Sequence, residues 1–155
     1  MSQEVKNQKK ILEKLQISEL NDMQKAASSA LDSSANVVLL SPTGTGKTLA
    51  FLLPLVAKLD PKCEYIQALI VAPSRELAIQ IEQVIREMGA GFKTSVVYGG
   101  RLFSKDKIDL KHLPAILVGT PGRLCDHIRR NSFSTKHISS LVLDEFDKSL
   151  EVGFE

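Results

Sequence analysis

The sequence predicts an α/β fold, in which a parallel sheet of about five strands is covered by helices on both faces. Two observations carry this prediction. Five short apolar segments recur along the chain, and the stretches between them place apolar residues at helical spacing. The apolar segments are nearly continuous rather than alternating, which is typical of strands buried on both faces. Strands that alternate with helices form parallel sheets with right-handed crossovers.

The composition is that of one globular domain. The chain has 155 residues, of which 43% are apolar and 25% are charged, and its net charge is only +2. Because no global basic field exists, any contact with nucleic acid must come from a local surface. We find no signal peptide and no apolar run long enough to cross a bilayer, so we expect a cytoplasmic protein without a membrane partner. Cys63 and Cys125 stand apart, as expected for reduced thiols.

The expected elements follow in order along the chain. Residues 1–34 form an N-terminal helical part, with helices at 7–15 and 19–31, and residues 35–155 form the sheet. Strands are expected at 36–40, 68–72, 94–98, 115–119 and 140–144. Helices are expected between them at 48–59, 75–88 and 123–130. The helix at 75–88 has the clearest apolar stripe, whereas Pro54 should end or kink the helix at 48–59.

Small, polar or charged residues follow each predicted strand. In open α/β sheets, ligands bind beyond the carboxyl ends of the strands, so we expect one edge of this sheet to carry the chemistry. The segments at that edge are 41–48, 73–77, 99–100, 120–123 and 144–147.

The first of these segments has the pattern of a phosphate-binding loop. It lies between a predicted strand and a predicted helix, and it contains Thr43, Gly44, Thr45, Gly46, Lys47 and Thr48. Gly44 and Gly46 allow backbone N–H groups to turn toward an anion at the start of the helix. Lys47 can reach the outer phosphates, and the Thr48 hydroxyl can bind Mg²⁺. The strict pattern has Gly where this chain has Ser41, and a glycine-rich turn without a ligand is the alternative.

The last segment places two carboxylates side by side. Asp144 and Glu145 end a buried apolar run, where adjacent carboxylates are costly unless a cation balances them. Mg²⁺ bound to a nucleotide would supply that balance, with Asp144 as the metal ligand. Glu145 would then orient and deprotonate the attacking water. The alternative is a solvated turn in which Asp147 caps a helix.

Together, these segments resemble the DEAD-box RNA helicases, specifically their first RecA-like domain. The similar segments are Ser-Pro-Thr-Gly-Thr-Gly-Lys-Thr at 41–48, Pro-Ser-Arg-Glu-Leu-Ala-Ile-Gln at 73–80, Gly-Gly at 99–100, Thr-Pro-Gly-Arg at 120–123 and Asp-Glu-Phe-Asp at 144–147. The resemblance implies a P-loop NTPase with ATP and Mg²⁺ as cofactors. It also implies an ATP-dependent RNA helicase, which couples hydrolysis to RNA strand separation or to remodelling of RNA–protein complexes.

The resemblance assigns the adenine-reading role to Gln24. Its side-chain amide can donate and accept at once, which matches adenine and not guanine. Residues 20–23 depart from the family's Pro-Thr-Pro-Ile, and no aromatic residue stands upstream near Asn7 to stack on the base. Ile17 could supply apolar cover instead. The alternative is that Gln24 is an exposed helix residue.

The resemblance also implies a surface that binds the RNA backbone. Its residues are Pro73, Ser74, Arg75, Gly99, Gly100, Thr120, Pro121, Gly122 and Arg123. Helix N-termini and arginines suit phosphate contacts, and the scarcity of aromatic residues argues against reading of bases. As alternatives, Arg75 could pair with Glu76, and Arg123 could be held by a carboxylate of the same chain. Asp147 would couple this domain to a second one.

The chain departs from the family at Phe146 and in its extent. The family has Ala at position 146, so we expect a smaller or shifted core residue near Phe146, with the chemistry retained because the acids are present.

The resemblance covers residues 11–154 and stops just after the Asp-Glu-Phe-Asp motif, before the family's Ser-Ala-Thr motif and second RecA-like domain. We therefore expect this chain alone to bind ATP weakly and not to unwind RNA, with a gap in the sheet beside 36–40. Alternatives are a nucleotide-gated RNA-binding module without turnover and a DNA-directed helicase or translocase domain.

Overall fold

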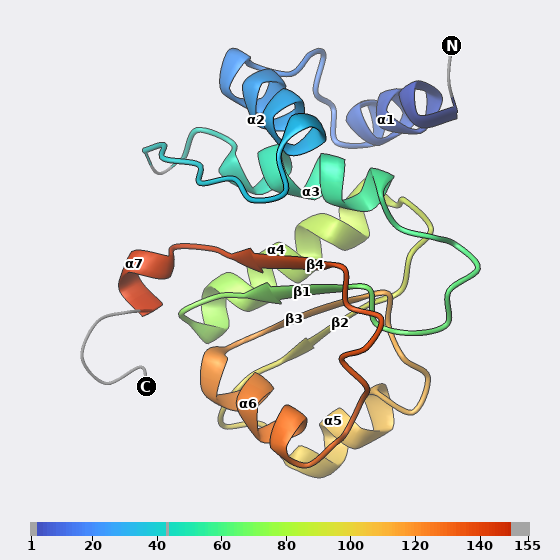
Figure 1. Ribbon diagram of the computed structural model, residues 1–155, viewed down its shortest axis with the longest axis vertical. Coiled ribbons are helices and arrows are strands. Elements are labelled where there is room, and N and C mark those ends of the chain that lie inside the picture. Colours follow the sequence, from blue (N-terminus) through green and yellow to red (C-terminus); the bar gives the residue numbers. More distant parts are fainter. Residues whose placement is uncertain (1–2, 43, 150–155) are drawn as a thin grey trace. The chain divides into compact units, whose positions relative to one another are not determined.

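The computed structural model describes residues 3–42 and 44–149 (Figure 1). The chain divides into two units, which are described one by one. The first unit extends to Leu59 and includes Glu87–Ala90. The second contains Asp60–Arg86 and the chain from Gly91 onward.

Three helices make up the first unit. They are α1 (Gln3–Lys14), α2 (Asp22–Ser33) and α3 (Lys47–Ala57). Helix α2 packs against α3. Helix α3 buries most of its side chains and continues through Pro54 to Ala57. Of the two expected effects, ending or kinking the helix, Pro54 therefore does not end it. Pro54 removes one backbone hydrogen bond, but burial of Leu52, Leu53 and Leu55 around it favours the continuous helix.

The segment at 36–40 is not a strand, which corrects the first strand expected from the sequence. These residues have no regular structure, and Val38 and Leu40 are 73% and 83% exposed. The segment has the composition of a strand, but its residues take part in none of the strand pairings of the sheet. An extended segment needs a neighbour for its backbone N–H and C=O groups before it becomes part of a sheet.

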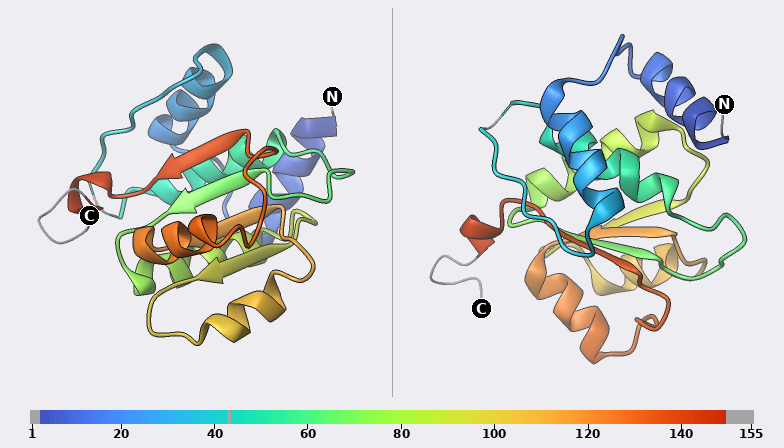
Figure 2. Two further views of the ribbon diagram at one scale, coloured as in Figure 1. Left: turned by 60° about the horizontal axis from the view of Figure 1, so that its bottom comes forward. Right: turned by 45° about the horizontal axis from the view of Figure 1, so that its top comes forward.

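Within the described residues, the second unit contains a parallel sheet of four strands rather than five. The strands are β1 (Ala68–Val71), β2 (Thr94–Val97), β3 (Ile116–Gly119) and β4 (Ser140–Leu143), in the order β2-β3-β1-β4. Ala68 of β1 aligns with Ile116 of β3 and with Ser140 of β4. The helices are α4 (Arg75–Met88), α5 (Phe103–Asp109), α6 (Pro121–Arg129) and α7 (Phe146–Ser149). Helix α4 lies on one face of the sheet and α5 and α6 lie on the other, as the two views in Figure 2 show.

The predicted elements of this unit are confirmed, with two additions. Helix α4 matches its predicted bounds, 75–88, and buries Ala78, Ile81 and Ile85. Helix α5 is the first addition, and it was not predicted because it has only seven residues and little apolar periodicity. The four-residue helix α7 was not predicted either. The core between the sheet and α5 and α6 consists of Ile66, Leu69, Val97, Leu110, Leu117, Leu124 and Phe133.

Strand β4 differs from the other three. The sequence predicts burial on both faces, but Leu141 and Leu143 are 61% and 54% exposed. Among the described strands, β4 pairs only with β1 and is an edge of the sheet. The central strand β3, in contrast, is buried along its whole length.

No helix of the described chain is long and apolar enough to cross a membrane.

Candidate functional site

The described part of the loop before α3 contains two glycines with a left-handed backbone. Gly44 and Gly46 have φ angles of 80° and 84°, in the left-handed region that favours glycine. The Thr45 hydroxyl donates to the Pro42 carbonyl at 2.8 Å, and the Ser41 hydroxyl lies 2.5 Å from the Thr45 oxygen. Ser41, which stands where the usual pattern has glycine, therefore forms a hydrogen bond with another residue of the same loop. Thr43, also predicted to bind ATP, lies outside the described residues.

Two side chains at the start of α2 hold this loop. Asn21 Nδ2 donates to the Thr45 carbonyl at 3.0 Å, and Gln24 Nε2 donates to the Gly46 carbonyl at 3.2 Å. Gln24 is only 5% exposed, so the alternative of an exposed helix residue is wrong. A Cβ atom at Gly46 would lie 2.6 Å from Gln24 Nε2, so a side chain at position 46 would displace this amide.

The sequence interpretation did not identify Asn21 as a site residue. Asn21 and Gln24 form a capping box: the Asn21 side chain accepts from the Gln24 N–H at 2.9 Å, and Gln24 Oε1 accepts from the Asn21 N–H at 3.0 Å. The spacing of a capping residue and a Gln three positions later is a recognisable sequence signal for this motif. In this structure, both ends of the Gln24 amide are therefore bonded inside the protein.

Lys47 and Thr48 begin helix α3, next to the loop. Both side chains are half-buried, and neither has a hydrogen bond or ion pair to another described residue. The N-terminus of this 11-residue helix presents N–H groups and a positive partial charge. A cationic amine, a free hydroxyl and turned backbone N–H groups fit a magnesium-bound polyphosphate. Ile17 lies half-buried between α1 and α2.

The carboxylate pair follows β4 in the second unit. Glu145 has a φ angle of 47°, a left-handed conformation that costs about 1–2 kcal/mol for a residue other than glycine. Its Oε2 atom lies 3.0 Å from Lys148 Nζ. Asp144 is half-buried, and its N–H donates to the Val71 carbonyl at 3.0 Å. No described group of three or more His, Cys, Asp or Glu side chains could hold a metal by itself, so Asp144 would share any cation with other ligands.

Phe146 and Asp147 follow this pair in α7. Phe146 is 41% exposed, so the expectation that it needs a smaller core residue nearby is wrong: much of the ring lies at the surface. Asp147 is exposed as well.

The start of α4 carries the next set of predicted residues. Pro73 is buried, and the Ser74 hydroxyl caps the helix by accepting from the Leu77 N–H at 3.2 Å. Arg75 bonds Glu76 Oε1 through Nε and Nη2 at 3.2 and 3.1 Å, which is the alternative pairing that the sequence left open. The pKa of Glu76 is lowered, first by its backbone hydrogen bond and then by the Arg75 guanidinium. Both side chains are exposed to solvent.

The turns after β2 and β3 carry the remaining predicted residues. Gly99 and Gly100 are exposed, and Gly100 has a φ angle of 85°. After β3, Thr120, Pro121 and Gly122 lead into α6, where the Leu124 N–H donates to the Thr120 carbonyl at 3.0 Å.

Arg123 is bonded inside the protein. Its Nε donates to Asp106 Oδ2 at 2.7 Å and its Nη2 donates to the Arg101 carbonyl at 2.8 Å, and the side chain is 12% exposed. The alternative of a carboxylate of the same chain is therefore realised, and Asp106 is that carboxylate. The turns after β2 and β3 are joined through this contact.

The sequence interpretation did not single out Gly119, the last residue of β3. A Cβ atom there would lie 2.8 Å from the Val97 carbonyl oxygen and 2.8 Å from the Leu124 side chain. Strand β3, strand β2 and α6 therefore meet at a position that only glycine can occupy.

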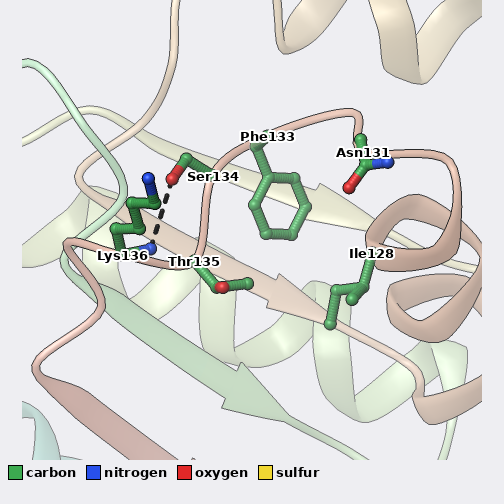
Figure 3. Close-up of a pocket in the computed structure, with 6 residues that line it drawn as sticks. All are labelled: Ile128, Asn131, Phe133, Ser134, Thr135 and Lys136. Atoms are coloured by element: carbon green, nitrogen blue, oxygen red, sulfur yellow. Dashed lines mark hydrogen bonds between the residues drawn. The ribbon is translucent and has the colours of Figure 1, made fainter.

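A surface hollow of about 380 Å³ is lined by none of the predicted site residues. Figure 3 shows the six residues that line it: Ile128, Asn131, Phe133, Ser134, Thr135 and Lys136. Its residues lie at the end of α6 and before the start of β4, whereas the predicted residues lie after the strand ends. It is therefore not part of the predicted ATP or RNA site.

Comparison with known proteins gives a consistent result. The model of the DEAD/DEAH box helicase family matches residues 21–155. The chain is 48% identical over 114 residues to the ATP-dependent RNA helicase CshA of Listeria monocytogenes, covering 72% of this chain and 22% of that protein. It is 39% identical over 156 residues to the DEAD-box ATP-dependent RNA helicase CshA of Geobacillus kaustophilus, covering 99% and 33%. It is 41% identical over 122 residues to the ATP-dependent RNA helicase DeaD of Escherichia coli K12, covering 77% and 19%. The chain thus spans about a fifth to a third of the length of these relatives.

Proposed function

The chain belongs to the DEAD/DEAH box helicase family, and we propose that it is the nucleotide-binding part of an ATP-dependent RNA helicase. One observation carries the proposal. The loop before α3 has two left-handed glycines, and the Lys47 amine beside it has no partner among the described residues. Such a loop binds a polyphosphate with little rearrangement of the protein.

In this proposal, ATP binds at the loop and at the start of α3. The N–H groups from Gly44 to Thr48 bind the phosphates, and Lys47 neutralises the outer ones. Gln24 reads the adenine, which requires its amide to exchange one of its two internal hydrogen bonds for the base. Ile17 supplies apolar cover for the ring.

Thr48 and Asp144 would hold Mg²⁺, with the Thr48 hydroxyl and the Asp144 carboxylate as ligands. When bound, the ion neutralises charge on the outer phosphates. Glu145 orients the attacking water and accepts its proton. Its Oε2 atom lies 3.0 Å from Lys148 Nζ, so the carboxylate has to leave this ion pair or share it when it takes the proton.

RNA binds through its backbone at the turns after β1, β2 and β3. Ser74 and Arg75 at the start of α4, Gly99 and Gly100, and Thr120, Pro121 and Gly122 at the start of α6 would make the contacts. Arg75 is exposed, and its single partner Glu76 is also exposed, so a phosphate can compete for its guanidinium. Arg123 would belong to this RNA-binding surface as well, through its internal bonds to Asp106 and to the Arg101 carbonyl.

A second RecA-like domain would complete the enzyme, and Asp147 would couple to it. Residues 1–155 by themselves would bind ATP weakly and would not unwind RNA, because the arginine fingers of this proposal would come from the second domain. We also propose that the protein is cytoplasmic, which its two free cysteines support.

The test of this function is a pair of variants in the phosphate loop and the acidic pair. Lys47→Ala removes the cation beside the loop and should abolish detectable binding of a fluorescent ATP analogue. Glu145→Gln is the matched control, since it leaves the loop intact; in a protein with the second domain it should retain nucleotide binding and lose RNA-stimulated hydrolysis. Unchanged nucleotide affinity in Lys47→Ala would refute the role of the loop, and continued turnover in Glu145→Gln would refute the role of the base.

A further inference from the structure

Asp106 is a buried carboxylate that neither nucleotide binding nor the proposed hydrolysis uses. It lies on α5 and is completely inaccessible to solvent. Its Oδ2 atom accepts from Arg123 Nε at 2.7 Å and lies 3.0 Å from His127 Nε2. Its Oδ1 atom lies 3.4 Å from Arg101 Nη1. We call Asp106, Arg101, Arg123 and His127 the Asp106 cluster.

The Asp106 cluster links segments that are distant in the sequence. Arg101 directly follows the Gly99–Gly100 turn, whereas Arg123 and His127 lie on α6. A further bond joins the two segments, because Arg123 Nη2 donates to the Arg101 carbonyl at 2.8 Å. Asp106 thus binds one side chain from the turn after β2 and two from the helix after β3.

Phe103 closes the cluster on another side. Its ring stacks on His127, with ring centroids 4.4 Å apart and planes inclined by 19°. The guanidinium groups of Arg123 and Arg130 lie 4.8 and 4.7 Å from the centre of the same ring. Arg123 is therefore held by a carboxylate, by a carbonyl and by an aromatic ring.

A buried ion-pair cluster of this kind contributes little net free energy to folding. Buried ion pairs lose much of their attraction to desolvation, and apolar residues of the same volume are often as stabilising. The cluster also leaves Asp106 Oδ1 and His127 Nδ1 buried without a hydrogen bond. A precise arrangement of the two segments is therefore a better explanation of the cluster than stability.

We propose that Asp106 is a positioning residue for RNA binding. It fixes the Gly99–Gly100 turn relative to the start of α6, so that both segments meet the same RNA backbone, and it holds Arg123 as part of this support rather than as a phosphate ligand. This inference rests on the proposed RNA-binding function. The order of the strands supports it, because β2 and β3 are neighbours and both segments follow their carboxyl ends.

If Asp106 served to neutralise arginines rather than to position them, the expected change in RNA affinity would have the opposite sign. If Asp106 only neutralised arginines that would otherwise bind phosphate, its removal would free two cations for RNA. Affinity would then rise, and the salt dependence would become steeper, by about 0.7 in slope for each added contact to single-stranded RNA. Loss of positioning instead lowers affinity at an unchanged slope.

The experiment measures binding of a fluorescein-labelled oligouridylate to this chain over a range of salt concentrations. Asp106→Asn should weaken binding by about ten-fold, the size of a typical coupling between contacting residues, with an unchanged salt slope. Arg129→Gln, which removes an exposed charge at the other end of α6, is the matched control and should change affinity much less. Tighter binding with a steeper slope, or unchanged affinity, in Asp106→Asn would overturn the proposal.

A second variant and a measurement of the active fraction distinguish a positioning effect from misfolding. If Asp106→Asn does not fold, Arg123→Lys keeps the charge beside Asp106 and loses the bond to the Arg101 carbonyl. This variant should also weaken binding at an unchanged slope, and unchanged affinity would show instead that the bond to the Arg101 carbonyl does not position the two segments. A variant that is merely destabilised lowers the active fraction in a stoichiometric titration, whereas a positioning variant raises Kd at full active fraction.

The experiment also separates this inference from the function on which it rests. If the unmodified chain binds no RNA, the proposed RNA function fails and the positioning role fails with it. If the unmodified chain binds RNA and Asp106→Asn binds it equally well, only the positioning role fails. Arg75→Gln gives the reference for a direct contact, since it should reduce the salt slope by about 0.7–1.

Discussion

Two loops of this molecule precede helices and carry predicted binding residues, but they are held in different ways. The turn at 120–122 continues from β3, which is buried and bonded to strands on both sides. The phosphate loop follows residues 36–40, which form no strand, and it is held by Asn21 and Gln24 instead. A loop of this kind can therefore keep its form through side-chain hydrogen bonds where the strand before it is absent.

The difference predicts unequal stability. The turn at 120–122 is fixed by close packing of backbone around Gly119, which tolerates little displacement. The phosphate loop depends on two hydrogen bonds, each contributing about 0.5–1.5 kcal/mol. Changes at the turn should therefore appear as losses of folding stability, and changes at the loop as losses of nucleotide affinity.

The largest expected effect is that of Gly119→Ala. The new Cβ would lie 2.8 Å from the Val97 carbonyl, which is backbone and cannot easily move. Overpacking of this kind costs about 1–3 kcal/mol, to be measured by urea unfolding. Gly122→Ala in the same turn is the control, since nothing lies within 4 Å of its Cβ, and its effect should be within about 0.5 kcal/mol. Equal stability of the two variants would show that the turn is not closely packed.

A smaller effect is expected at Gly46. Gly46→Ala forces a left-handed φ on alanine, at a cost of about 1–2 kcal/mol, and displaces the Gln24 amide. Affinity for a fluorescent ATP analogue should fall about ten-fold, since 1.4 kcal/mol is a factor of ten. Gly44→Ala has the same backbone strain but an open Cβ position, so the difference between the two variants isolates the Gln24 contact. If both variants lose the same affinity, Gln24 does not hold the loop.

The smallest effect is expected at Asn21. Asn21→Ser keeps an oxygen that can cap α2 but is too short to bond the Thr45 carbonyl, so nucleotide affinity should fall a few-fold, as for the loss of about 1 kcal/mol. Asn21→Ala should lower affinity equally and, in addition, lower the free energy of unfolding by about 1 kcal/mol through the lost cap. Full affinity in both variants would show that the loop is stable without Asn21.

Much of the fold could be predicted from local sequence patterns. Helix α4 and the four strands were predicted because their apolar residues are continuous or periodic over several positions. The segment 36–40 has the same composition and still forms no strand, because pairing depends on a neighbour that composition does not reveal. Helix α5 was missed because its seven residues are mostly polar and because Asp106 looks like a surface residue in the sequence.

In the candidate site too, residues of a local pattern could be predicted, whereas contacts between distant residues could not. Gly44, Gly46 and Lys47 could be predicted as site residues because a phosphate loop depends on the conformation of a few consecutive residues. The partner of Arg123 could not, because Asp106 is separated from it by 17 residues and by strand β3. Sequence patterns identify the groups that meet a ligand more readily than the groups that support them.

The exposed strand β4 has a practical consequence for all of these measurements. No other strand of the described residues pairs with its outer edge, and Leu141 and Leu143 add apolar surface there. Such an edge is a template on which a second polypeptide can add a strand, so this chain should self-associate as its concentration rises. Titrations should be run at low micromolar protein and repeated at several dilutions, and a charged residue at position 141 would improve solubility without touching either loop.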